Sequence, residues 1–296
     1  MATGGSDKNP KDIVYLNGRF VPRTEARVSV EDRGFVFGDG VYEVLRAING
    51  RLFATRFHNE RLERSLEGVR IQLRGNDSSA RFVEIGKQLL RENGLTSGQA
   101  TLYMQVTRGA TTRSHYFPPA DVTPTIYISV ARFTPYAELA ETGAAAISHP
   151  DLRWARCDLK TLNLLPNVLA SQAAKEQGAF EAMLVRDGFV TEGAKTNFFG
   201  VVNGYLRTHP VDNHILPGIT RSVLRDLARE LRIELEERPI SVEEIPRTTE
   251  LFLTGTTTDV MPIVQLDGKP VGTGKPGELT RRLQKVLAES LASGSD

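Results

Sequence analysis

Cysteine is almost absent from this sequence, and that scarcity limits how the chain can be held together. Cys157 is the only cysteine among 296 residues. A single thiol excludes an internal disulfide framework and is typical of proteins from a reducing compartment. Stability must therefore come from a hydrophobic core. A chain of this length can bury about three quarters of the surface that it exposes when unfolded.

Long apolar segments and strong charge bias are also missing. No apolar run approaches the roughly 20 residues that a membrane-spanning helix needs. The first residues, MATGGSDKNPKD, lack the apolar core of a signal peptide. The formal net charge is +1, and no basic stripe suits a nucleic acid or an anionic membrane surface. We therefore expect a soluble, cytoplasmic protein with neither nucleic acid nor membrane as a partner.

Motifs for metal and nucleotide chemistry are missing as well. The sequence contains no HExxH, CxxC or EF-hand spacing, no Walker-type GxxxxGK(S/T) and no GxSxG elbow. Its five histidines show no ligand spacing. We therefore expect no metal site.

Turn and helix signals are plentiful and indicate a mixed fold. Asn-Gly pairs at 17–18, 49–50 and 203–204 predict β-hairpins, since asparagine and glycine tolerate the positive φ angles of a type I′ turn. Helices are predicted at about 79–93, after Lys160 as far as Gly178, and at about 220–231 and 278–291. The order is neither a βαβ alternation nor all-β, so the predicted class is α+β.

The chain length predicts two domains. Residues 1–10 read as a disordered polar tail. A small N-terminal α/β domain is expected over residues 11–132. An interdomain loop with Pro135 follows at 133–137, and a larger, strand-rich C-terminal domain with surrounding helices covers residues 138–296.

Two segments have the character of anion sites, although each also has an ordinary interpretation. Pro217-Gly218-Ile219-Thr220-Arg221 precedes a predicted helix, whose first N–H groups and dipole attract anions. On these signals alone, a plain loop entering a helix is the favoured interpretation. Thr254-Gly255-Thr256-Thr257-Thr258 follows a short apolar strand and offers several hydroxyl donors. Threonine runs are also common in strands and turns.

Other candidates are charged side chains. Arg113 and His115 lie two apart, so in an extended segment they point to one side and can converge on a carboxylate. Glu192 ends a predicted strand, where a glutamate is usually exposed. Lys160 lies among apolar residues and two arginines, a setting that would lower the pKa of its amine as a Schiff-base lysine requires. Locally, each of these remains one polar residue among many.

Taken together, the segments resemble the class IV aminotransferases, which form fold type IV of the pyridoxal-phosphate enzymes. Among them the chain is most similar to the D-amino-acid (D-alanine) aminotransferases. The matching stretches occur in the family's order between residue 31 and about 262. They are EDRGFVFGDGVYEV, RFHNERLERS, LYMQVTRG, TRSHYFP, DLRWARCDLKTLNLLPNVLASQ, VTEGAKTNFFG, THPVDNHILPGITR and LFLTGTTTD.

The resemblance implies a pyridoxal 5′-phosphate cofactor and assigns residues to it. Lys160 would be the catalytic lysine, carrying the cofactor and moving the proton of the substrate α-carbon. Glu192 would pair with the pyridine nitrogen, Arg61 would hold the phosphate, and Leu216 would pack on the ring. The remaining implied cofactor-binding residues are Gly218, Ile219, Thr220, Thr256 and Thr257.

It also implies a substrate site and a partner. Tyr42, Arg113 and His115 resemble the carboxylate trap of the D-amino-acid enzymes, in which the arginine and histidine come from the neighbouring subunit of a homodimer. Val44 and Tyr103 would line the substrate pocket.

The expected reaction moves the amino group of a D-amino acid, such as D-alanine, to a 2-oxo acid such as 2-oxoglutarate by a ping-pong mechanism. The alternatives with the same fold are a branched-chain L-amino-acid or R-amine transaminase and aminodeoxychorismate lyase. A non-catalytic cofactor-binding protein is a further alternative. The sequence departs from the D-specific pattern at Lys195, where those enzymes carry a small hydroxyl residue, and at Pro166 and Pro217.

Overall fold

The computed structural model describes residues 12–293, which form two compact units. The first unit extends to Thr134 and also includes Leu159–Asn163, whereas the second contains Pro135–Asp158 and Leu164–Ser293. The change of unit at Thr134 falls within the boundary predicted near residues 132–137. The sequence did not predict that Leu159–Asn163 would return to the first unit. The predicted disordered tail, residues 1–10, lies outside the described residues.

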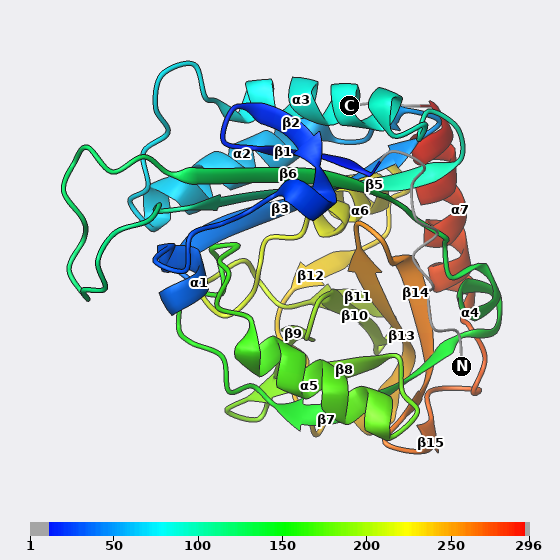
Figure 1. Ribbon diagram of the computed structural model, residues 1–296. Coiled ribbons are helices and arrows are strands. Elements are labelled where there is room, and N and C mark those ends of the chain that lie inside the picture. Colours follow the sequence, from blue (N-terminus) through cyan, green and yellow to red (C-terminus); the bar gives the residue numbers. More distant parts are fainter. Residues whose placement is uncertain (1–11, 294–296) are drawn as a thin grey trace. The chain divides into compact units, whose positions relative to one another are not determined.

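The first unit is built on an antiparallel sheet that has six strands within the described residues, in the order β2-β1-β6-β5-β3-β4 (Figure 1). The strands are β1 (Ile13–Leu16), β2 (Arg19–Pro22), β3 (Gly40–Ile48), β4 (Arg51–Leu52), β5 (Gln99–Thr107) and β6 (Thr125–Arg132). The helices α2 (Thr55–Gly68) and α3 (Ser79–Glu92) pack against it, and α1 (Arg33–Phe37) is a short turn before β3.

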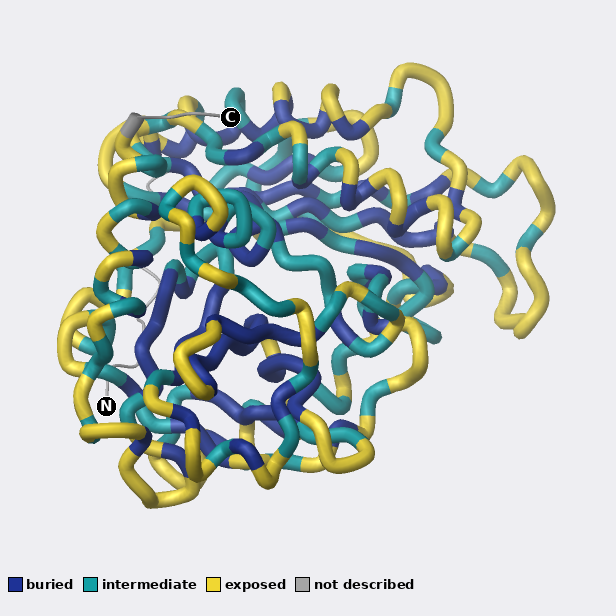
Figure 2. The backbone as a smooth tube through the Cα atoms, turned by 180° about the vertical axis from the view of Figure 1, so that it is seen from behind, coloured by how far each residue is buried: buried dark blue, intermediate teal, exposed yellow. Residues whose placement is uncertain are grey.

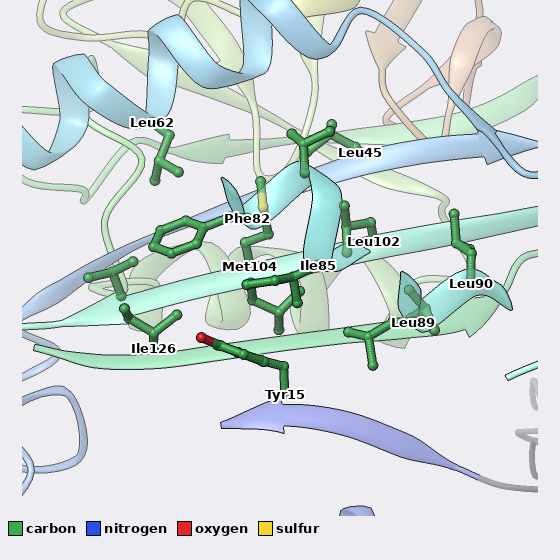
Figure 3. Close-up of a cluster of buried hydrophobic side chains, with 14 of the residues drawn as sticks. Tyr15, Leu45, Leu62, Phe82, Ile85, Leu89, Leu90, Leu102, Met104 and Ile126 are labelled. Atoms are coloured by element: carbon green, nitrogen blue, oxygen red, sulfur yellow. The ribbon is translucent and has the colours of Figure 1, made fainter. Parts of the chain in front are cut away.

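The core of this unit forms between the sheet and helices α2 and α3. In β5 every second side chain is buried, and Leu102, Met104 and Val106 meet Phe82 and Leu62 from the helices. Figure 3 shows Leu62, Phe82, Leu102 and Met104 gathered in this cluster beside the sheet. The opposite face of β3 and β5 carries the partly exposed candidate substrate residues Tyr42, Val44 and Tyr103.

The second unit contains a mixed sheet with nine strands among the described residues, in the order β12-β11-β10-β13-β14-β7-β8-β9, with β15 paired to β14. Contacts between β9 and β10 show that the sheet curls toward closure. The strands are β7 (Ala144–Pro150), β8 (Glu181–Arg186), β9 (Phe189–Gly193), β10 (Asn197–Val202), β11 (Tyr205–Thr208), β12 (Leu235–Glu237), β13 (Thr248–Gly255), β14 (Asp259–Leu266) and β15 (Lys269–Pro270).

Helices cover this second sheet. The helix α5 (Leu165–Glu176) packs on β7 and β8, α4 (Ala137–Thr142) packs on β14, and both α6 (Ile219–Glu230) and α7 (Glu278–Ser293) pack on β13. All six residues of β10 are buried, and the central strands are dark blue in Figure 2. Short 3-10 turns occur at Arg23–Glu25 and Ile245–Arg247. Among residues 12–293, no helix combines the length and apolar character needed to cross a bilayer.

The expected α+β class is confirmed, as are the three Asn-Gly hairpins. Asn17, Asn49 and Asn203 all have positive φ angles, as the type I′ signal required. The helix predicted at 79–93 is α3, with Ser78 capping its first turn through a hydrogen bond from Arg81 N. The strand predicted to end at Glu192 is β9, whereas the short elements α1, α4 and β12 are too brief for a periodic pattern to reveal.

Candidate functional site

Lys160 belongs to the segment Leu159–Asn163, which is hydrogen-bonded into the first unit. The backbone N–H of Tyr42 donates to the Lys160 carbonyl at 3.0 Å, and the N–H of Lys160 donates to Ser65 Oγ at 3.1 Å. Thr161 forms an isolated β-bridge with Val41. The backbone of Lys160 is therefore fixed on both sides, and its Nζ lies 4.2 Å from the centre of the Tyr42 ring.

A buried ionic cluster lies next to this lysine. Glu43 is fully buried and accepts hydrogen bonds from Arg61 Nε at 2.7 Å and Arg61 Nη2 at 2.9 Å. Its second oxygen also contacts His58 Nδ1 at 2.8 Å. Burial alone would raise the pKa of Glu43, but Arg61 and His58 hold it well below its ordinary value. Burial lowers the pKa of His58, and the positive charges of Arg61 and Lys160 add to that effect.

Tyr42, Val44 and Tyr103 lie together on the sheet face that the helices leave uncovered. Tyr42 and Val44 are two residues apart in β3, and Tyr103 of β5 is the cross-strand partner of Val44. The Tyr42 and Tyr103 rings are 5.8 Å apart. Burial raises the pKa of Tyr103 to about 12, helped by the neighbouring Tyr42 and Tyr127. These three side chains form an aromatic and aliphatic wall next to Lys160 Nζ.

Arg113 and His115 lie in an exposed loop between β5 and β6. The Arg113 guanidinium is 5.1 Å from the centre of the Phe37 ring, and the His115 ring is 5.5 Å from it. Both side chains therefore lie against the Phe37 ring, although their segment is a bent loop and not a strand. Within one chain they meet on Phe37, and both remain exposed to whatever approaches this loop.

In the second unit the centre is Glu192, which is buried rather than exposed as a strand-end glutamate usually is. Arg153 donates to one carboxylate oxygen, Asn197 Nδ2 donates to the other at 2.8 Å, and the Leu216 N–H lies 3.1 Å from both. Burial raises the pKa of Glu192 to about 7, although Arg153 and the Leu216 N–H oppose the shift. The carboxylate is thus fixed in position but poorly solvated.

The loop before α6 and the first residues of that helix lie next to Glu192 and Asn197. Asn197 Nδ2 also donates to the Leu216 carbonyl at 2.9 Å, which ties the loop before α6 to β10. Gly218 caps α6, and a Cβ at this position would overlap Asn197 Oδ1. Only glycine therefore lets the chain pass Asn197 and turn into the helix. Ile219 and Thr220 begin the helix and are buried, so their N–H groups are sheltered donors of the kind that helix starts present to anions.

The threonine run adds donors in the same unit. Thr256 and Thr257 are half-buried in the turn between β13 and β14. Thr254, at the end of β13, is the cross-strand partner of Asn197 in β10. Its buried Oγ1 has no hydrogen-bond partner among the described residues. A group with acceptor atoms at this place would satisfy it.

The structure thus divides the predicted residues between the units. Lys160, Arg61 and the five substrate residues lie in the first unit, and the other cofactor residues lie in the second. Sequence reasoning missed the residues that hold them, namely Glu43, His58, Arg153 and Asn197. Each comes from a matching stretch, but only the fold shows what it contacts.

Two expectations need correction. The arginines near Lys160 in sequence do not act as unbalanced charges, since Arg153 pairs with Asp151 and Glu192 and Arg156 pairs with Asp158. The histidines also do form one cluster, because His209 and His214 lie together with Asp212.

The sequence of this chain is similar to the sequences of known proteins. The family model described as amino-transferase class IV matches residues 40–266. D-alanine aminotransferase of Staphylococcus epidermidis is 42% identical over 283 residues, which cover 95% of this chain and 99% of that protein. D-alanine aminotransferase of Bacillus licheniformis is 41% identical over 280 residues, covering 95% and 97%.

Solved structures share the fold. The branched-chain amino acid aminotransferase of Escherichia coli has a TM-score of 0.87 at 27% identity, over 97% of this chain and 96% of that one. Another branched-chain amino acid aminotransferase, solved with pyridoxamine 5′-phosphate, has a TM-score of 0.85 at 25% identity, covering 96% and 95%.

Proposed function

Because this chain belongs to the class IV aminotransferases, which depend on pyridoxal phosphate, we propose that it transfers the amino group of a D-amino acid to a 2-oxo acid. The observation that carries the proposal is the pair Arg113 and His115, two exposed side chains that both contact the Phe37 ring and whose chemistry suits a carboxylate. Neither residue is among those proposed to hold the cofactor, so the pair bears on the choice of substrate.

The residues of the second unit fit the cofactor. Pyridoxal phosphate brings a phosphate, for which the start of α6 and the hydroxyls of Thr256 and Thr257 are suitable donors. Its ring nitrogen matches Glu192, whose buried carboxylate would hold that nitrogen protonated. Leu216 follows the loop next to Glu192 and would support the ring face. Arg61, a buried cation fixed by Glu43, is proposed as the further phosphate ligand.

Lys160 is proposed as the catalytic lysine. When bound, the cofactor withdraws electrons from the substrate α-carbon. Lys160 Nζ would take the proton from that carbon and deliver it to the C4′ atom of the cofactor. The Lys160 carbonyl accepts a hydrogen bond from the Tyr42 N–H, and the Lys160 N–H donates to Ser65 Oγ. These two bonds fix the backbone of the segment, so only the lysine side chain has to move. The Tyr42 ring shields the amine on one side.

The substrate carboxylate is proposed to bind Tyr42 together with Arg113 and His115 of a neighbouring subunit. An arginine offers a planar pair of donors that matches a carboxylate. Val44 and Tyr103 would contact the substrate side chain. This arrangement requires a homodimer, for which α5 supplies a suitable surface. Leu165, Val168 and Leu169 share one helix face and are 69%, 58% and 59% exposed.

The second substrate is proposed to be a 2-oxo acid such as 2-oxoglutarate, which would give ping-pong kinetics. The lone buried thiol of Cys157 fits a cytoplasmic location, which we also propose. Lys195, with its ammonium 5.1 Å from the centre of the Phe180 ring, is the main departure from the D-specific pattern. The rival substrates are branched-chain L-amino acids, R-amines and the substrate of aminodeoxychorismate lyase.

The decisive experiment follows the first half-reaction with D-alanine and with L-alanine. The readout is the absorbance change as the bound cofactor is converted from pyridoxal phosphate to pyridoxamine phosphate. We expect the D-enantiomer to react faster. Faster reaction with L-alanine, L-leucine or an R-amine would reject the D-amino-acid assignment while leaving the transaminase intact.

The Arg113→Ala variant tests the carboxylate trap. Its turnover of D-alanine should fall by about a hundredfold or more, since a bidentate ion pair is lost. The cofactor spectrum should stay unchanged, because Arg113 is not among the residues proposed to hold the cofactor. Arg81, an exposed arginine of α3, provides the matched control. An unchanged rate in Arg113→Ala would contradict the trap, whereas a protein whose cofactor is visible but never reacts would indicate a binding function alone.

A further inference from the structure

Two histidines and an aspartate converge on the loop between β11 and α6, outside the residues assigned to catalysis. His209 is buried, and the side chains of Asp212 and His214 are each 36% exposed. One candidate ligand atom from each lies within 4.8 Å of the other two. We propose that His209, Asp212 and His214 form a binding site for one divalent transition-metal ion of the Zn²⁺ type.

The spacing of the donor atoms supports this proposal. Asp212 Oδ1 lies 3.8 Å from His209 Nδ1, and Asp212 Oδ2 lies 3.3 Å from His214 Nδ1. Two ligands that bind the same Zn²⁺ at about 2.1 Å are roughly 3.4 Å apart in a tetrahedral site. The second pair is a hydrogen bond in this structure, which the ion would replace, whereas the first distance is too long for a hydrogen bond and is close to the separation that a shared ion would produce.

The loop that carries these ligands is fixed by its backbone. The His209 carbonyl accepts a hydrogen bond from Arg221 Nη2 at 2.8 Å, and the His214 carbonyl accepts one from Arg153 Nη2 at 2.9 Å. Between them, the carbonyl of Asn213 accepts the N–H of Cys157 at 2.9 Å. Because the backbone is already held, binding a metal requires only small rotations of side chains.

The donor set also selects the metal. Imidazole nitrogens suit Zn²⁺, Ni²⁺ and Cu²⁺, whereas Mg²⁺ and Ca²⁺ prefer an all-oxygen environment. Three protein ligands leave one tetrahedral position for water, and the exposure of Asp212 and His214 gives the ion a route from solvent. His209 Nδ1 now contacts the Pro210 carbonyl at 2.9 Å. That imidazole would exchange this contact for the metal.

Equilibrium dialysis of the chelator-treated holoenzyme against Zn²⁺, with elemental analysis, tests the site. We expect one Zn²⁺ per chain with a micromolar or tighter Kd. Asp212→Asn and His214→Gln should each weaken binding by about tenfold or more. His149→Gln is the matched control, since His149 Nδ1 contacts the Pro150 carbonyl at 2.8 Å but belongs to no such cluster among the described residues. Its affinity should equal that of the wild type.

X-ray absorption at the zinc edge keeps the test informative if a variant folds poorly. The proposed site gives a shell of nitrogen and oxygen with imidazole scattering. A sulfur ligand would place the ion on Cys157 instead and would overturn the proposal. Absence of Zn²⁺ binding, or equal losses in His149→Gln and His214→Gln, would overturn it as well.

Discussion

Replacing Glu192 with glutamine should abolish a defined part of the protein's pH-dependent stability. Burial raises the pKa of this carboxyl from 4.5 to about 7 in the folded protein. The unfolded chain loses the proton near the ordinary value, whereas the folded protein retains it until about pH 7. The free energy of unfolding therefore falls as the pH rises between these values. With about 1.4 kcal/mol for each pH unit, the loss is about 3 kcal/mol.

Urea unfolding of the cofactor-free protein and of Glu192→Gln, at one protein concentration and a series of pH values, measures this loss. All other titrating groups are common to both proteins and cancel in the difference. We expect that difference to change by about 3 kcal/mol between about pH 4.5 and 7.5. A difference that stays constant would show that Arg153 and Asn197 keep Glu192 ionised throughout, and would refute the reasoning. With cofactor bound, the cationic ring nitrogen should move the transition to lower pH.

Three further predictions concern separate parts of the molecule. Arg61→Lys keeps the charge near Glu43 but loses the paired hydrogen bonds, so cofactor affinity should fall by about tenfold or more in a fluorescence titration; equal affinity would remove Arg61 from the phosphate site. Gly218→Ala should destabilise the loop before α6 by about 1–3 kcal/mol, seen as a lower melting temperature. Leu169→Asp should convert the proposed dimer to a monomer in sedimentation velocity, whereas the same change at exposed Arg74 should not.

The sequence predicted the helices and hairpins well wherever a local rule applies. Asn17-Gly18 predicts its turn because the two residues themselves carry the required backbone conformation. The helix α1 was missed because five residues cannot show a period, although Asp32 caps it and Gly38 ends it in the left-handed conformation. These two residues were the available signal.

The sequence predicted which residues make up the candidate site, but it did not predict the contacts that hold them in place. Lys160 and Glu192 follow from the resemblance, but their supports come from contacts between distant segments. Arg153 binds Glu192 across 39 positions of sequence, and Glu43 binds Arg61 across 18. No local pattern records such pairing. The His209–His214 cluster was missed for another reason. Its three residues are close in sequence, but their spacing matches none of the motifs searched for, and it is the conformation of the loop that brings the side chains together.

The return of Leu159–Asn163 to the first unit has a consequence for how this gene can be divided. A fragment that starts at Pro135 carries Lys160 but lacks Ser65 and the Tyr42 N–H that hold its backbone. A fragment that ends at Thr134 keeps those partners but has no lysine at this position. Neither half is an autonomous module. If relatives exchanged gene segments at this boundary, the lysine of one protein would be held by the residues of another at the positions of Tyr42 and Ser65. The two halves must therefore change together.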